Sequence, residues 1–180
     1  MSDKPSSPVK LERNLDRSGF TSGATELDEW LRQYAWQNQR TNNVTTYVSH
    51  VGGTVVGYYA ITVASYDRAG APSSLVKGAP AQVPCILLAR LAVDESWHGR
   101  GMGAALLRDA LRRTVFISGS VGARLFLAHA RDEAAHAFHM RHGDFIESPV
   151  EPLHLMVSIP ELAKIPGFGS SDEPGSFTPG

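Results

Sequence analysis

The hydrophobic and polar positions along this chain repeat with two different periods, one typical of strands and one typical of helices. Residues that are apolar at every second position, or in short unbroken runs, predict strands, whereas apolar residues three and four positions apart predict helices. The strands fall at 9–12, 45–51, 54–62, 85–93, 123–130, 145–146 and 153–157, and the helices at 25–40, between Gly103 and Val115, and at 132–141. This order predicts an α/β fold, a mixed sheet of about six to seven strands with helices on both faces.

The segments between these elements set the limits of the domain. Gly52-Gly53 predicts a tight hairpin between two strands, and the proline- and glycine-bearing segment 65–84 is expected to be a loop. Thr25 and Asp28 have the spacing of a capping box at the start of the first helix. We expect a flexible N-terminus over 1–8, one domain over 9–165, and a disordered tail over 166–180.

Composition narrows the classes of function. The chain has 180 residues and a net charge of −1, so contact with nucleic acid would need a local basic patch. Its one cysteine, Cys85, excludes an internal disulfide and stands in an apolar run that predicts burial.

The histidines lack ligand spacing, so we expect no metal. Without an apolar signal core or a run of about 18 apolar residues, we expect a cytoplasmic protein with no membrane contact.

The segment from Cys85 to Arg113 carries the strongest chemical signal. An apolar run ends at Val93, a short acidic turn follows, and three glycines precede a helical pattern. Glycine lets the backbone approach a phosphate closely, and the first amides of a helix attract anions, so this arrangement predicts a pyrophosphate site. The spacing fits neither the dinucleotide nor the nucleoside-triphosphate fingerprint. A plain helix entry with glycines for tight packing is the alternative.

The stretch from Arg90 to Gly103 resembles the acetyl-coenzyme A motif of the GNAT acetyltransferase superfamily. Its pattern, Q/R-x-x-G-x-G/A after a hydrophobic strand, appears here as His98-x-x-Gly101-x-Gly103, with histidine where glutamine or arginine is usual. The resemblance implies the GNAT fold and acetyl-CoA as cofactor. It also implies that acetyl-CoA is held by Leu91, Ala92, Val93, His98, Gly99, Arg100, Gly101, Met102, Gly103, Ala104 and Phe138.

Three further segments, 20–38, 55–62 and 88–94, are similar to those of the GNAT toxins of type II toxin-antitoxin modules. The resemblance implies acetylation of the α-amine of aminoacyl-tRNA, a ribbon-helix-helix antitoxin as partner, and a homodimer. An acetyltransferase for a small amine or a protein N-terminus is an alternative. A catalytically decayed partner subunit that still binds acetyl-CoA is another.

One departure concerns catalysis. The subgroup reads A-F-Y-x-x-x-G-F near its last helix, and the tyrosine donates a proton to the leaving thiolate; here His139 takes its place and Asp144 is inserted. His139 is therefore the candidate catalytic residue, either facing the cleft or turned outward as a surface histidine. The candidate substrate-binding residues are the cations Arg90, Arg108 and Arg112, each of which has a solvated face or an ion pair as its alternative.

Overall fold

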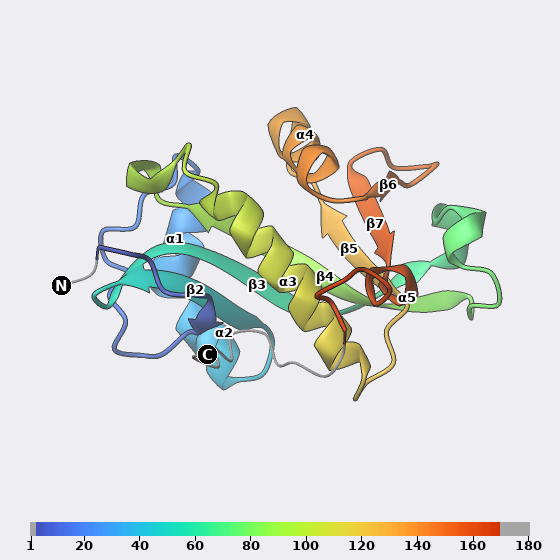
Figure 1. Ribbon diagram of the computed structural model, residues 1–180, viewed down its shortest axis with the longest axis horizontal. Helices are drawn as coiled ribbons and strands as arrows, with labels where there is room; N and C mark the ends of the chain where they lie inside the picture. Colours follow the sequence, from blue (N-terminus) through green and yellow to red (C-terminus); the bar gives the residue numbers. More distant parts are fainter. Residues whose placement is uncertain (1–2, 170–180) are drawn as a thin grey trace. The chain divides into compact units, whose positions relative to one another are not determined.

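The computed structural model describes residues 3–169 of the chain, so parts of both predicted terminal segments, 1–2 and 170–180, lie outside the described residues. The elements are β1 (Val9–Lys10), α1 (Thr25–Gln33), α2 (Ala35–Arg40), β2 (Thr45–Val51), β3 (Thr54–Asp67), η1 (Arg68–Gly70), η2 (Ser73–Leu75), β4 (Gln82–Val93), η3 (Glu95–Trp97), α3 (Met102–Ser118), β5 (Leu125–His129), α4 (Glu133–His142), β6 (Ile146–Glu147), β7 (His154–Ser158) and α5 (Ile159–Leu162). Figure 1 shows them along the chain.

The strands form one seven-stranded sheet in the order β1-β2-β3-β4-β5-β7-β6. Most neighbours are antiparallel, but β4 and β5 run parallel, so the sheet is mixed, as predicted. The chain divides into two compact units. The first comprises the residues up to Thr62 together with Ala89–Leu107, and the second comprises Val63–Leu88 together with the residues from Arg108 onward.

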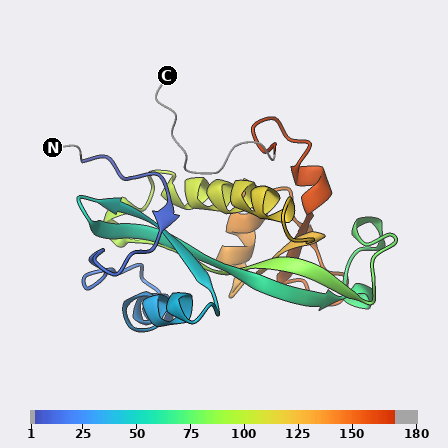
Figure 2. The same ribbon diagram turned by 90° about the horizontal axis from the view of Figure 1, so that it is seen from below.

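In the first unit, helices cover both faces of the β2–β3 hairpin, which is joined at Gly52-Gly53 as predicted. Side chains alternate across a strand, so neighbours on β3 face opposite ways. Tyr58 lies in the core on the α1 side, and its hydroxyl donates to the Leu27 carbonyl at 2.8 Å. On the other face a Cβ at Gly57 would lie 2.7 Å from Met102 Sδ, so the start of α3 contacts the strand backbone (Figure 2).

The predicted helix 25–40 is two helices, because the chain bends at Tyr34 (φ −120°, ψ −25°). At the bend Tyr34 is 53% exposed, whereas its neighbour Ala35 is buried. The prediction of a capping box at Thr25 and Asp28 is also wrong. Ala24 is the N-cap and provides no side-chain cap, whereas the buried carboxylate of Asp28 accepts hydrogen bonds from the amide and hydroxyl of Ser22.

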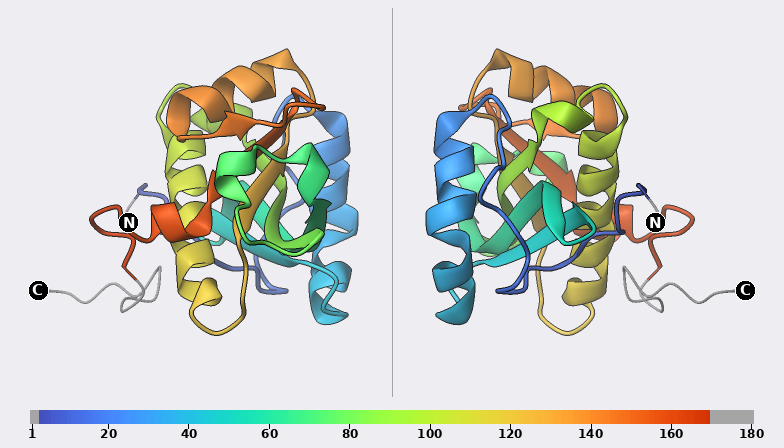
Figure 3. Two further views of the ribbon diagram at one scale, coloured as in Figure 1. Left: turned by 90° about the vertical axis from the view of Figure 1, so that its right-hand side faces the viewer. Right: turned by 90° about the vertical axis from the view of Figure 1, so that its left-hand side faces the viewer.

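In the second unit, β5 is flanked by β4 and β7, and β6 follows β7 at the edge (Figure 3). Leu125 and Leu127 lie in a core cluster that includes Cys85, and burial raises the pKa of that thiol to about 11. Phe126 points to the opposite face, where it contacts Phe145. The predicted burial of Cys85 is therefore confirmed.

At the end of α4, only a glycine leaves enough room for a neighbouring ring. A Cβ at Gly143 would lie 2.6 Å from the ring of Phe145, while its φ of −147° is ordinary extended backbone. At the other end, the Asp132 side chain accepts from the Ala135 amide at 2.8 Å. Close approach, rather than a left-handed conformation, explains the glycine that the sequence places after this helix.

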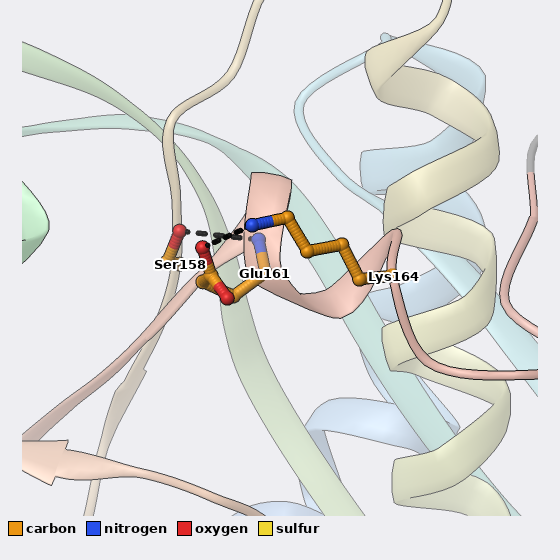
Figure 4. A network of polar contacts seen from close by, with 3 residues as sticks. All are labelled: Ser158, Glu161 and Lys164. Atoms are coloured by element: carbon orange, nitrogen blue, oxygen red, sulfur yellow. Dashed lines mark hydrogen bonds and ion pairs between the residues drawn. The ribbon is translucent and has the colours of Figure 1, made fainter.

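Three features of the second unit were not predicted. The strands β3 and β4 extend into the expected loop, leaving only residues 68–81 between them. The short helix α5 follows β7, with Ser158 Oγ accepting from the Glu161 amide at 3.3 Å and Lys164 Nζ lying 2.9 Å from Glu161 Oε1 (Figure 4). Beyond it, the buried Phe168 lies under the Arg108 guanidinium. None of the helices within residues 3–169 has the length and apolar content that a membrane crossing requires.

Candidate cofactor and substrate site

The last residues of β4 lead into the candidate site in the first unit. Ala92 is buried in the core that contains Tyr58, so Leu91 and Val93, its half-buried neighbours, face the other side of the strand. The Asp94 amide donates to the Val56 carbonyl at 2.9 Å. This end of the strand is therefore fixed against β3 just before the turn begins.

The turn is organised by the carboxylate of Asp94. It accepts hydrogen bonds from the Thr21 amide at 3.0 Å, and from the amide and hydroxyl of Ser96 at 3.0 and 2.7 Å. Burial favours a higher pKa for Asp94, but these hydrogen bonds and the nearby His98 outweigh it and lower the pKa. Asp94 therefore acts as an ionised cap that holds η3 and the first unit's N-terminal segment together.

His98 occupies the position where the resemblance expects glutamine or arginine. Its side chain is exposed, and Nε2 lies 2.7 Å from the Val93 carbonyl. Because a carbonyl only accepts, this ring nitrogen carries the hydrogen. The imidazole therefore folds back on the strand end, where it closes the turn from outside.

Gly99 and Gly101 give the turn its path. Both have positive φ, 73° and 80°, and a Cβ on either would meet no atom within 4 Å. The amide of Ala105 makes the helical bond to the Gly101 carbonyl at 3.0 Å, so the amides of residues 101–104 have no intrahelical acceptor. Open space beside free amides at the start of α3 fits a diphosphate, a group present in the acetyl-CoA that the resemblance implies.

Arg100 adds a cation to this turn. Its guanidinium carbon lies 4.6 Å from the centre of the Trp97 ring. A cation–π contact of this kind keeps the exposed side chain beside the turn rather than free in solvent. The sequence predicted Arg100 as a cofactor residue but gave no role to Trp97.

Arg90 has the partner that its place in a central strand required, but that partner is aromatic. The guanidinium carbon lies 4.2 Å from the centre of the Trp30 ring, and Trp30 stacks on Tyr58 at 6.0 Å. Burial raises the pKa of Tyr58, so its hydroxyl stays protonated. Trp30 lies in the predicted helix 25–40, and no sequence signal linked it to Arg90.

The other candidate residues lie in the second unit. Phe138 is half-buried and contacts the rings of His139 and His142 at 5.3 and 5.0 Å. Arg108 is exposed, with its guanidinium carbon 4.9 Å from the centre of the Phe168 ring, and Arg112, one turn further along α3, is half-buried. The tail segment therefore already contacts one of the predicted substrate cations.

His139 is only 7% exposed, so the prediction that it could be a surface histidine is wrong. Its ring packs edge-on against Phe145 at 5.4 Å, and Nδ1 has no hydrogen-bond partner among the described residues. Burial, with a smaller contribution from His136, lowers the pKa of His139 to about 4. The imidazole is therefore neutral near pH 7, and it can act only as a neutral donor or acceptor.

Within residues 3–169, no group of three or more histidine, cysteine, aspartate or glutamate side chains is placed to hold an ion.

Comparison with known proteins identifies relatives across most of the chain. The family model described as "Acetyltransferase (GNAT) family" matches residues 12–144. A tRNA-acetylating toxin of Mycobacterium tuberculosis (strain ATCC 25618 / H37Rv) is 40% identical over 162 residues, which cover 90% of this chain and 97% of that protein.

Solved structures agree with the fold. AtaT complexed with acetyl-methionyl-tRNAfMet superposes with a TM-score of 0.80 at 26% identity, covering 86% of this chain and 95% of AtaT. AtaTR bound with AcCoA superposes with a TM-score of 0.74 at 27% identity, covering 86% and 94%. The predicted fold class is confirmed.

Proposed function

Because the chain belongs to the acetyltransferase (GNAT) family, we propose that it acetylates the α-amine of aminoacyl-tRNA and thereby acts as a toxin that blocks translation. The observation that carries this proposal is the likeness, over nearly its whole length, to the mycobacterial toxin named for tRNA acetylation. The chain is an N-acetyltransferase, and acetyl-CoA is its acetyl donor.

The turn after β4 is the proposed cofactor site. The amides of residues 101–104 would bind the diphosphate, with Gly99 and Gly101 leaving space for it and Arg100 adding positive charge. Leu91, Ala92 and Val93 would line the cofactor with backbone groups, and a free amide there would stabilise the oxyanion. The His98 ring is hydrogen-bonded to the Val93 carbonyl, so we propose that it stabilises the turn and does not itself contact the cofactor. Acetyl-CoA supplies an activated thioester carbonyl to this site.

The amine needs little help from the protein. A free α-amine titrates near pH ~8 and an adjacent ester lowers its pKa further, so a large neutral fraction is present without a strong base. Attack by this amine forms the C–N bond of the amide and breaks the C–S bond of the thioester, and the proton that the nitrogen loses passes to the departing sulfur, directly or through solvent, so that the products are the amide and the thiol. Arg90, Arg108 and Arg112 are proposed to neutralise RNA phosphates.

His139 is proposed to assist the departing thiolate as a neutral imidazole, and Phe138 to pack beside the cofactor. With a pKa of about 4 for His139, activity is expected to rise with the neutral amine and to show no fall near pH 6.5. His139→Phe should lower kcat about a hundredfold, and His139→Tyr should retain activity. If His139→Phe changes neither the rate nor the pH profile, His139 is not a catalytic residue.

The decisive experiment incubates the protein with acetyl-CoA and a pool of charged tRNAs and identifies acetylated aminoacyl groups by mass spectrometry. Gly101→Asp serves as the variant without a cofactor site. Unchanged aminoacyl groups would refute the proposal. Transfer to small amines or peptide N-termini would then establish the first alternative, and acetyl-CoA binding without any transfer would establish the decayed subunit.

We further propose that the protein is cytoplasmic and that the domain over residues 9–165 carries the activity. Segments 1–8 and 166–180 are then extensions of this domain. Its proposed partners are a ribbon-helix-helix antitoxin and a second copy of the chain. Each extension makes a contact with the domain: the Ser6 amide donates a hydrogen bond to the His50 carbonyl at 2.8 Å, and the Arg108 guanidinium lies over the Phe168 ring. Light scattering of the purified protein tests the dimer, and co-purification with the product of a neighbouring short gene tests the antitoxin.

A further inference from the structure

Two imidazole rings stack at one end of the β5–β7 pair. His129 is the last residue of β5 and His154 the first of β7, and the two are direct partners across the antiparallel pair. Their ring centres lie 4.0 Å apart with planes inclined by 21°. His154 is half-buried and His129 is exposed, so the stack ends at the surface.

The inner ring is held by a hydrogen-bond network. Tyr66 Oη lies 2.8 Å from His154 Nδ1 and 3.4 Å from Ser148 Oγ. Ser148 already donates to the Gly70 carbonyl at 2.6 Å and accepts from the amides of the two residues that follow Pro149. A hydroxyl has one hydrogen and two lone pairs, so the Tyr66 hydrogen belongs to His154 Nδ1. His154 therefore carries its own hydrogen on Nε2.

The outer ring, His129, lies on the face of an inner ring that is held from two directions. The Tyr66 ring meets His154 edge-on at 5.6 Å, which holds the inner ring from a second direction. Burial and the charge of His154 lower the pKa of His129. The stack therefore presents the face of the His129 ring on an inner ring whose orientation is set before anything binds.

We propose that the His129–His154 stack is a platform for one unpaired nucleobase of an RNA acceptor end, which lies against the His129 ring. The acceptor end of a tRNA is single-stranded, and proteins recognise such ends by stacking bases on aromatic side chains, histidine included. The platform rests on the proposed function for its ligand, because aminoacyl-tRNA is what presents an unpaired base to this protein. Among residues 3–169, no group of three or more histidine, cysteine, aspartate or glutamate side chains is placed to hold a metal ion.

The test measures binding of an uncharged RNA hairpin with a single-stranded end that carries 2-aminopurine at its last position. Stacking quenches this fluorophore. His129→Ala should weaken binding about tenfold and abolish the quenching, whereas His129→Phe should retain both because it keeps a ring. The matched control is His142→Ala, which removes an exposed imidazole from α4 of the same unit.

Four outcomes would overturn the platform. Equal loss in His129→Ala and His129→Phe would mean that a ring nitrogen matters instead of the ring face. Wild-type binding in both variants, or no RNA binding by the wild type, would mean that no base stacks there. A weaker acetyl-CoA affinity in His129→Ala by calorimetry, with RNA binding unchanged, would assign the ring to the adenine of the cofactor.

The same design separates this inference from the proposed function. Uncharged RNA binds without acetyl transfer, so ring-dependent binding can hold even if no charged tRNA is acetylated. A hairpin whose last nucleotide lacks its base should bind the wild type and His129→Ala equally. Acetylation of charged tRNA with no dependence on the His129 ring would leave the proposed function standing and remove the platform.

Discussion

The cofactor turn and the histidine stack are built in opposite ways. The turn occupies consecutive residues, 94–104, and its path is set by two glycines with positive φ, by backbone hydrogen bonds, and by the Asp94 and His98 side chains, which bond to nearby backbone groups. The stack takes His129, His154, Tyr66 and Ser148 from separate segments, and side-chain contacts hold it. A site made of backbone is therefore specified locally, whereas a site made of side chains depends on the register of the strands that carry them.

The largest expected effect comes from Gly101→Asp, which attacks the backbone site directly. A side chain at φ 80° strains the turn by about 1–2 kcal/mol, and its carboxylate would repel a diphosphate at the free amides. Acetyl-CoA affinity should fall by about a hundredfold or more. Isothermal titration of the folded protein measures it.

Gly78→Asp is the matched control. Gly78 has φ 77° and open space at its Cβ, but it lies between η2 and β4 in the other unit. Gly78→Asp should lower the free energy of unfolding by a similar amount and leave acetyl-CoA binding intact. Equal loss of binding in both variants would show that general destabilisation, not the turn, explains the effect.

The next effect concerns a buried side chain, His139, and the pH dependence of stability. Its pKa is about 4 in the folded protein and near 6.5 when unfolded, so between these values the unfolded chain binds a proton that the folded protein does not. Stability is therefore complete above pH 6.5 and falls as the pH drops towards 4. This residue should lower the free energy of unfolding by about 2 kcal/mol between pH 7.5 and 5.

Urea denaturation at the two pH values compares the wild type with His139→Phe, which should lack this part of the difference. His142→Phe is the control, because it changes an exposed ring on the same helix and leaves His139 in place. If His139→Phe keeps the full wild-type difference, the histidine is not held neutral by burial.

The contrast between the two sites also explains what the sequence could predict. The strand, turn and glycines of 85–103 were readable because period and spacing act over a few residues. The contact of Arg90 with Trp30 was not, because it joins β4 to α1 across the core. The sequence predicted Thr25 as the partner of Asp28, but the partner is Ser22. The reason is related: two local hydrogen-bonding geometries compete, and packing decides between them.

Asp94→Ala tests whether side chains also support the turn. The variant removes the acceptor for the Thr21 amide and for Ser96, and a cap of this kind contributes about 1 kcal/mol. We expect a comparable fall in stability and a several-fold loss of acetyl-CoA affinity. Asp16→Ala, which removes a carboxylate bonded to Ser18 in an exposed loop, is the control. Unchanged affinity would mean that the glycines alone maintain the site.

The smallest effect is expected from Tyr66→Phe, which removes one hydroxyl from the histidine stack and keeps the ring. His154 Nδ1 loses its donor, but because His154 is half-buried, water can replace part of the bond. Ser148 loses nothing, since its lone pairs are already filled by backbone amides. The free energy of unfolding should therefore fall by about 1 kcal/mol, against no more than about 0.5 kcal/mol for Tyr34→Phe, which alters an exposed tyrosine. Urea denaturation distinguishes the two variants. A loss above about 3 kcal/mol would mean that Tyr66 also supports Ser148, contrary to the hydrogen-bond count, and no loss would mean that the Tyr66 hydroxyl does not fix the inner ring.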